Sequence, residues 1–427
     1  MRHHGFATRL FAAASALAAA AALLAGPSAS AQQRPADLTV LPPVPTDYTP
    51  PKTAWGDYNF SHTYQIEYLN NMRLLVQRPK VFGNRVWLTD EEFARRVAAA
   101  ERQDSSFAQA SENGVGTPGT QGLAEFIKKS SLGHRTSMLV SPADGQLPPL
   151  TPQAQALYKA GRSGWVPGQN YDWVDDFDSW DRCVSRGFPA SMFPFRYNNG
   201  IRIFQSPGVM VINLEMLGTR VVPIRGAGDP MHWPRPVEAW MGNPVGHWEG
   251  KTFVIETTNI KSGDSASHDW TKRAASPLNM ASQNVPPFNT IPMSPQARTV
   301  ERLTMTGPNS LTYEITYSDP EVYTQPWTAR LEWARDDKYQ FFEYACHEGD
   351  VQVRNYITAS RAYRAQIARG ETPEIPAAAD DRARFATQFD YDPAANDRPA
   401  PPPRPAGAAP PPGAAPPAAG AARPSGG

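Results

Sequence analysis

The chain has 427 residues, of which 41% are hydrophobic, and its 41 basic residues balance 41 acidic ones. A formal net charge of zero argues against binding to nucleic acid or to an anionic membrane surface, because both partners need a basic patch. The part that precedes a Pro- and Ala-rich end is long enough for one large domain or two ordinary ones with a sizeable core.

Residues 1–31 have the features of a signal peptide. Arg2 and Arg9 give a basic start, an apolar run follows, and Ala29 and Ala31 supply the small residues that signal peptidase recognises. The run is shorter than the roughly 20 residues that span a bilayer, so an uncleaved anchor is the less favoured alternative. We therefore expect a periplasmic or secreted protein, with no membrane insertion once the leader is removed.

Pro-rich segments flank the globular part. Residues 32–54 contain prolines, which fix φ and lack an amide donor, so this segment is predicted to form an extended arm. Residues 371–427 are predicted to be a disordered tail, because from Arg398 onward the chain is mostly Pro, Ala and Gly, a composition that cannot bury a core. Such a tail is either a simple spacer or a means of reaching a partner in the cell envelope.

Residues 55–199 are predicted to mix helices and loops. Thr89 and Glu92 have the spacing of a capping box at the start of a helix over 90–102. The stretch that follows, 103–121, is rich in Ser, Gly, Gln and Asn, which is typical of a loop.

Two further helices are indicated in this part of the chain. Thr151 as N-cap and Pro152 at the first helical position predict a helix over 152–160. Within Tyr171–Cys183, aspartates alternate with an apolar stripe at helical spacing, which predicts a helix with a solvated acidic face. The stripe consists of Trp173, Phe177, Trp180 and Val184. A cation site is the alternative, although the aspartates lack the spacing and the glycine of a calcium loop.

Residues 200–370 show the two-residue alternation of antiparallel strands, most clearly over 311–318. Strands are expected at 201–205, 209–215, 219–224, 252–258, 299–305, 311–318, 327–334 and 339–346. A loop over 261–297 interrupts the series, and a helix is expected after Tyr356. We therefore predict a mainly β protein with α additions, an antiparallel β-barrel or sandwich of about eight or more strands.

The chain contains two cysteines, Cys183 and Cys346. In an oxidising compartment an even count predicts that they form a disulfide. The alternative is a free Cys346 nucleophile beside His347, which would need a thiol of low pKa in that compartment.

His247 and His347 are the histidines best placed for chemistry, since each lies beside a Glu and a Gly. If residues 246–249 are extended, His247 and Glu249 project from the same face and could form an orienting pair for acid–base chemistry or two metal ligands. His347 is the third candidate catalytic residue, although Glu348 beside it would point the other way in a strand. A surface or structural role is the alternative for each histidine.

Aromatic residues make up 10% of the chain. Most of them are expected to fill the core, and a subset on the concave face of a barrel would form a pocket for a flat or apolar ligand. Trp248 and Tyr197 are candidate ligand-binding residues. Arg182, beside the predicted disulfide, would supply a positive charge for a carboxylate or a developing oxyanion. Alternatively, Arg182 pairs with the aspartates of its own segment.

Ordered motifs run through the chain from about residue 55 to residue 365. They are QRPKVFGNRVWLTDEE before the first predicted helix, RTSMLVSPADGQLPPLT from Arg135, WDRCVSRGFP from Trp180, YNN from Tyr197, GHWEG from Gly246, VERL from Val300, PWTAR from Pro326 and YACHEG from Tyr344. Together they resemble a family of exported, uncharacterised proteins of Gram-negative bacteria. The resemblance implies one unit from the arm to the last helix, and it carries no established activity.

The chain departs from that family at two places. Family members often carry a His where this chain has Met216–Thr219, and an acidic residue where it has Lys251. If the family's His binds a metal, that chemistry is in doubt here. We predict no metal and no other cofactor.

Three functions remain open from the sequence. The first is a soluble periplasmic or secreted protein that binds a small apolar or aromatic ligand. The many aromatic residues favour it, and so does the absence of a familiar catalytic motif such as G-x-S-x-G or H-E-x-x-H. The second is a periplasmic hydrolase or lyase that uses His247, Glu249 and His347. The third is a structural or interaction protein of the envelope that uses its tail.

Overall fold

The computed structural model describes residues 34–66, 76–112, 128, 132–160, 170–195, 198–226, 228, 232–234, 237–263, 276–278, 291–372 and 374. The predicted signal peptide, nearly all of the predicted tail and Tyr197 lie outside these residues.

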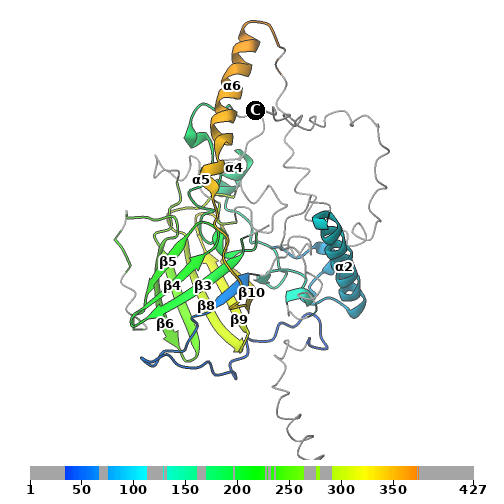
Figure 1. The fold of residues 1–427 in the computed structure, drawn as a ribbon, viewed down its shortest axis with the longest axis vertical. Helices are drawn as coiled ribbons and strands as arrows, with labels where there is room; N and C mark the ends of the chain where they lie inside the picture. Colours follow the sequence, from blue (N-terminus) through cyan, green and yellow to red (C-terminus); the bar gives the residue numbers. More distant parts are fainter. Residues whose placement is uncertain are drawn as a thin grey trace, which may run out of the picture. The chain divides into compact units, whose positions relative to one another are not determined.

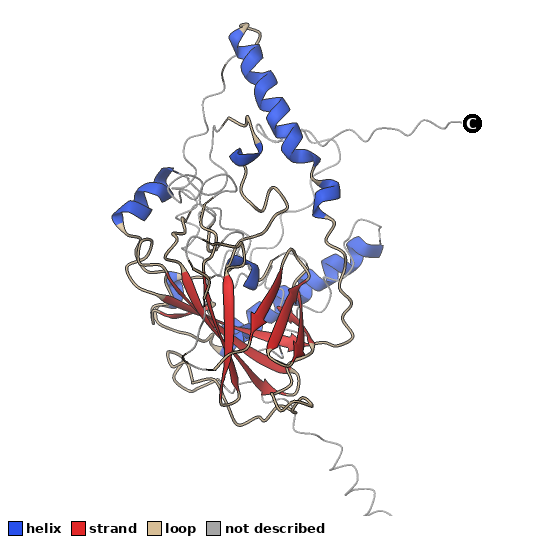
Figure 2. Ribbon diagram, turned by 90° about the vertical axis from the view of Figure 1, so that its left-hand side faces the viewer, coloured by secondary structure: helices blue, strands red, loops and turns tan. Residues whose placement is uncertain are grey.

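Ten strands form one antiparallel sheet that curls into a nearly closed barrel, as predicted (Figures 1 and 2). The strands are β1 (Thr63–Ile66), β2 (Leu139–Ser141), β3 (Gly200–Ser206), β4 (Val209–Leu214), β5 (Thr219–Pro223), β6 (Asn243–Glu249), β7 (Thr252–Thr258), β8 (Arg298–Gly307), β9 (Ser310–Ser318) and β10 (Trp327–Arg335). Their order is β5-β4-β3-β1-β10-β9-β8-β7-β6, and β2 pairs with β10. A parallel bridge between Ile224 and Gly246 joins the two ends of this order.

Alternating side chains explain why these segments form a barrel. On β9, Leu311, Tyr313, Ile315 and Tyr317 are each 0% exposed, whereas the residues between them are half-buried. Aromatic rings fill the interior, since Tyr313 stacks on Trp333 of β10 with ring centroids 4.6 Å apart. Burial of such rings is the main driving force for closing a sheet of this size.

Helices lie outside the sheet. Within the described residues they are α2 (Asp90–Glu112), α4 (Pro152–Ala160), α5 (Cys346–Gly349) and α6 (Val351–Ala368), with short 3-10 turns at Lys80–Phe82, Leu132–His134, Val174–Asp176 and Ala190–Met192. Helix α4 has the predicted bounds. Helix α2 continues through part of the predicted loop, because residues 106–112 are mostly good helix formers despite their polarity. Helix α6 begins before the predicted position.

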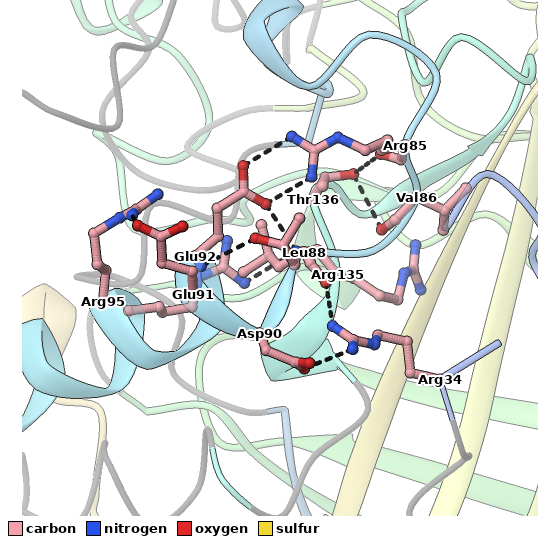
Figure 3. Close-up of polar contacts among 12 residues, drawn as sticks. Arg34, Arg85, Val86, Leu88, Asp90, Glu91, Glu92, Arg95, Arg135 and Thr136 are labelled. Atoms are coloured by element: carbon pink, nitrogen blue, oxygen red, sulfur yellow. Dashed lines mark hydrogen bonds and ion pairs between the residues drawn. The ribbon is translucent and has the colours of Figure 1, made fainter. Parts of the chain in front are cut away.

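The predicted capping box of α2 is confirmed (Figure 3). The Glu92 carboxylate accepts the Thr89 amide at 2.8 Å, and Thr89 Oγ1 accepts the Glu92 amide at 3.2 Å. Arg85 also donates to both Glu92 oxygens, at 2.7 and 2.8 Å. Arg34 of the arm reaches the same helix start, where it pairs with Asp90 at 2.5 Å.

The described part of the arm is held against the barrel by long basic side chains. Lys251, in the turn between β6 and β7, donates to the carbonyl oxygens of Thr46, Asp47 and Tyr48 at 2.9, 3.2 and 3.2 Å. Arg330 of β10 donates to the Pro42 carbonyl at 2.8 Å. Lys251 therefore anchors the arm to the turn between β6 and β7.

The prediction of a helix over Tyr171–Cys183 is wrong. This segment contains only the 3-10 turn Val174–Asp176 and irregular turns. Aspartate side chains bind the local backbone: Asp176 accepts the Trp173 amide at 2.9 Å, and Asp178 accepts the amides of Trp180 and Asp181 at 2.8 and 2.9 Å. Short carboxylates that capture amides in this way compete with helical hydrogen bonds.

The prediction of a strand over 339–346 is also wrong. This segment pairs with no strand of the sheet, and it ends in helix α5. Its aromatic residues instead cross the start of β3. Buried Glu215 accepts the Tyr339 hydroxyl at 2.8 Å and the Phe342 amide at 2.8 Å. The Phe341 ring lies under the Arg202 guanidinium, 4.6 Å from its centroid. Side-chain contacts, and not strand pairing, hold the segment in place.

Candidate functional site

Cys183 and Cys346 form the predicted disulfide, with Cα atoms 5.7 Å apart across 163 residues of sequence. The bond joins the turn-rich segment after Asp178 to helix α5. No cysteine is left free, so the alternative of a Cys346 nucleophile is wrong for this structure.

A groove of about 330 Å³ lies beside the disulfide. It is lined by Trp180, Asp181, Cys183, Tyr344, Ala345, Cys346, Gly349, Asp350 and Gln352. The rings of Trp180 and Tyr344 are nearly parallel, 14° apart, with centroids separated by 5.9 Å. The groove is therefore built from two segments that are distant in sequence and are linked covalently by the disulfide.

Local hydrogen bonds fix the Trp180 wall. Asp178 Oδ1 accepts the Trp180 amide, and the Trp180 carbonyl accepts the Cys183 amide at 3.0 Å. The indole also makes an edge contact with Phe195, at a centroid distance of 5.2 Å. These bonds and contacts fix the position of the Trp180 ring.

The other lining residues come from helix α5 and the residues around it. The Tyr344 carbonyl accepts the Cys346 amide at 2.9 Å, and the His347 carbonyl accepts the Asp350 amide at 3.2 Å. Oδ1 of Asp350 is buried and accepts no hydrogen bond. Burial raises the pKa of Asp350, while the nearby His347 and a hydrogen bond with Gln352 lower it.

The predicted pair His247 and Glu249 does come together, on β6 at the barrel wall. The two side chains are 3.2 Å apart, Nε2 to Oε1, and Arg302 of β8 pairs with the other oxygen of Glu249 at 2.7 Å. Hydrogen bonds from Arg302 and then from His247 lower the pKa of Glu249. Glu249 remains 46% exposed, and neither residue lines the groove.

Trp248 points to the other face of β6, into the barrel. Its ring makes edge contacts with Tyr58 and Phe60, with centroids 5.7 and 5.3 Å away, and it lies 4.9 Å from the ring of Phe253. This candidate ligand-binding residue is therefore part of the aromatic packing of the barrel. Tyr197, the other aromatic candidate, lies outside the described residues.

Arg182 and His347 lie beside the disulfide without lining the groove. Arg182 donates to the Asp178 carbonyl at 3.2 Å and pairs with Asp175 at 3.4 Å. This contact is the alternative expected from the sequence, in which Arg182 pairs with the aspartates of its own segment. His347 is exposed on α5, and its predicted place at the edge of a strand is wrong.

Apart from Cys183 and Cys346, the sequence did not indicate the residues that line the groove. Trp180 was expected on a helical core stripe and Tyr344 on a strand, and Asp350 was not considered. A usable indication was present, since Trp180 and Tyr344 each lie within three positions of a cysteine of the predicted disulfide. A bond between those cysteines brings both rings into one neighbourhood.

Comparison with protein-family models, with curated proteins and with solved structures finds no match to this chain. Among the described residues, no group of three or more His, Cys, Asp or Glu side chains is placed to hold a metal ion. Within the same residues, no helix is both long enough and apolar enough to cross a membrane.

Proposed function

We propose that this chain is an exported binding protein that takes a small ring-bearing molecule into the groove beside the disulfide. The observation that carries the proposal is the near-parallel pair of Trp180 and Tyr344 rings at the wall of this groove. Aromatic faces contribute about 0.5–1.5 kcal/mol for each stacked partner beyond the area that they bury.

The size of the groove supports a small ligand. Sites for small molecules typically enclose about 300–1,000 Å³, and the groove has a volume of about 330 Å³. A molecule with one or two rings and a short substituent fits this volume. An extended lipid or a peptide would leave most of its surface outside.

The barrel serves as the scaffold in this proposal. Its interior is occupied by side chains such as Trp327, Trp333 and Tyr317, each 0% exposed. A rigid, filled barrel supports the segments of irregular structure that carry the groove, an arrangement that is common for binding sites. Export agrees with the disulfide, because such bonds persist in oxidising compartments.

Calorimetry and thermal shift with a library of small ring compounds test the proposal. We expect at least one compound to stabilise the protein, and Trp180→Ala to weaken its binding by at least tenfold. Trp173→Ala is the matched control, because Trp173 is 64% exposed and does not line the groove. If no ring compound binds, or if both variants bind equally well, the proposal is wrong.

Acid–base catalysis is the second candidate, and one observation favours it, the 3.2 Å contact between His247 and Glu249. Against it stands Arg302, which already pairs with the carboxylate. Screening of ester and amide substrates, with His247→Ala as the inactive control, tests this candidate.

A further inference from the structure

His134 lies where three segments of the chain meet outside the sheet. Its imidazole stacks on the Phe93 ring of α2, with centroids 3.6 Å apart and ring planes inclined by 17°. Its carbonyl oxygen accepts the Leu88 amide at 2.9 Å, and Arg34 of the arm donates to the carbonyl of that leucine at 2.6 Å. The residue therefore occupies the junction of α2, the arm and the 3-10 turn that it ends.

Two guanidinium groups act on this imidazole. Arg96 of α2 donates to the carbonyl oxygens of the residues on either side of His134, at 2.6 and 2.8 Å. Arg34 approaches from the arm, where it pairs with Asp90 of α2 (Figure 3). Both arginines disfavour a proton on His134, whereas Asp90 favours one.

The other charged groups near the junction bind other partners. Arg85, from the segment before α2, donates to both carboxylate oxygens of Glu92. The buried Arg135 side chain donates to the backbone carbonyl of Arg330 on β10. Among the described residues, Asp90 is thus the carboxylate that acts on His134.

The surroundings of His134 suit a neutral imidazole. Within the described part of the chain, its Nδ1 atom is shielded from water and has no hydrogen-bond partner. Both ring nitrogens carry hydrogen in the protonated form, so protonation would leave a buried donor without an acceptor. Burial, followed by the charges of Arg34 and Arg96, lowers the pKa of His134 from its ordinary 6.5. The attraction of a charged imidazole to the Phe93 face opposes these effects without outweighing them.

We propose that His134 is an acid-sensitive latch, whose protonation weakens the attachment of the arm and of the start of α2 while the barrel stays folded. In the undocked state the imidazole is hydrated and takes up a proton near its ordinary pKa of 6.5. The docked state binds this proton less well, so docking is most favourable above that pH and becomes less favourable as the pH falls below it. One pH unit lower, the undocked fraction can rise by about tenfold at most.

Hydrogen exchange tests the latch in the full chain without its predicted signal peptide, at about pH 7.5 and about pH 5.5, values on either side of the ordinary histidine pKa. The Val86 and Trp87 amides report on the arm, because both donate to the Leu38 carbonyl, at 2.8 and 3.1 Å. After correction for the intrinsic pH dependence of exchange, we expect their protection to fall by about threefold to tenfold at the lower pH. Amides of the ladder between β8 and β9 should keep their protection.

Two variants separate His134 from the other titrating groups. His134→Phe keeps a ring against Phe93 and cannot take up a proton, so its protection should not change over this pH range. His62→Gln is the matched control, because burial also lowers the pKa of His62, which lies directly before β1 beside Asp337. This control should retain the pH dependence of the natural protein.

The latch is overturned if the pH dependence survives in His134→Phe, or if His62→Gln abolishes it. An equal loss of protection in the β8–β9 ladder would mean that acid unfolds the whole molecule, which also overturns it. NMR titration of the His134 imidazole in the natural protein is a second measurement that needs no variant. A pKa below 6.5 supports the latch, and a pKa at or above 6.5 overturns it.

Discussion

Arg220 of β5 donates to both carboxylate oxygens of Glu301 of β8, at 2.7 and 2.5 Å, in the barrel interior where both side chains are 0% exposed. Strands β5 and β8 are not neighbours in the sheet, so the pair joins separate parts of the barrel wall. Tyr313 also donates to Glu301 at 2.8 Å, and the ring of Phe188 lies 4.3 Å from the guanidinium carbon.

Removal of one charge of this pair should strongly destabilise the barrel. Glu301→Gln leaves the buried guanidinium of Arg220 without a counter-charge, and we expect the free energy of unfolding to fall by about 3–5 kcal/mol. Denaturation by urea measures the loss. The double variant Arg220→Met/Glu301→Leu should lose less than the single one, because it buries no uncompensated charge. If Glu301→Gln is as stable as the natural protein, the conclusion that this buried pair stabilises the barrel is wrong.

The capping box of α2 should make the free energy of unfolding depend on pH. Hydrogen bonds from Arg85 are the largest cause that lowers the pKa of Glu92, from its ordinary 4.5 to about 2. The carboxylate therefore stabilises the folded state above pH 4.5, and this contribution is lost as the pH falls towards 2. Because the pair is partly exposed, we expect Glu92→Gln to lose about 1–2 kcal/mol at neutral pH.

The stability difference between the natural protein and Glu92→Gln should shrink as the pH is lowered through that window, which urea titrations at several pH values would show. Glu91→Gln is the control, because Glu91 is 84% exposed and pairs with Arg95 at the surface. A difference that stays constant with pH would mean that the charge of Glu92 contributes nothing.

Loss of the disulfide should affect the groove more than the barrel. Neither α5 nor α6 contains a buried residue. The Cys183–Cys346 bond attaches these helices together with ring contacts and ion pairs between α6 and residues 171–177. We expect Cys183→Ala/Cys346→Ala to lose about 2–4 kcal/mol, and residues 343–368 to become sensitive to protease. Alkylation of the unreduced natural protein followed by mass spectrometry should label no cysteine. If both cysteines are labelled, the disulfide does not form in the protein.

A side chain at position Gly246 should lower the stability of the barrel. A Cβ atom at this position would lie 2.3 Å from Phe253 Cζ and 3.0 Å from Val222 Cγ1. We expect Gly246→Ala to cost about 1–3 kcal/mol of stability through overpacking. Gly349→Ala is the matched control, because nothing lies within 4 Å of a Cβ there. Equal melting temperatures for the two variants would contradict the prediction.

His247 should be dispensable for ligand binding. It lies on the face of β6 opposite to Trp248 and outside the groove. We expect His247→Ala to bind ring compounds as the natural protein does, and to unfold within about 1 kcal/mol of it, since the contact that it loses is with a half-exposed carboxylate. Lost turnover of a substrate at an unchanged melting temperature would instead support the catalytic candidate.

The barrel could be predicted because its long strands bury one face each. The alternation of Leu311, Tyr313, Ile315 and Tyr317 is complete, and the capping residues of α2 and α4 precede the helices that they start. Strands β1 and β2 have too few residues for a periodic pattern, and they form only because longer strands template them.

The groove could not be predicted because its walls depend on contacts between distant segments. The aspartates of 171–183 bind amides where a helix was expected, and Tyr339 binds Glu215 where a strand was expected. Both outcomes follow from competition between side chains and the backbone for hydrogen bonds, which a hydrophobic pattern does not show. The disulfide was the one long-range contact that the composition indicated.

The join between β5 and β6 is unlike every other contact between adjacent strands of the barrel. Neighbours such as β3 and β4 share a ladder from Ile201 to Ser206, whereas β5 and β6 meet at the Ile224–Gly246 bridge, with a hydrogen bond from Arg225 to Gly246 of 2.8 Å. Local opening follows the smallest loss of hydrogen bonds and buried area. The barrel therefore has a line of weakness along this seam. The strands of the Arg220–Glu301 pair lie on opposite sides of the seam, so this buried pair opposes its opening.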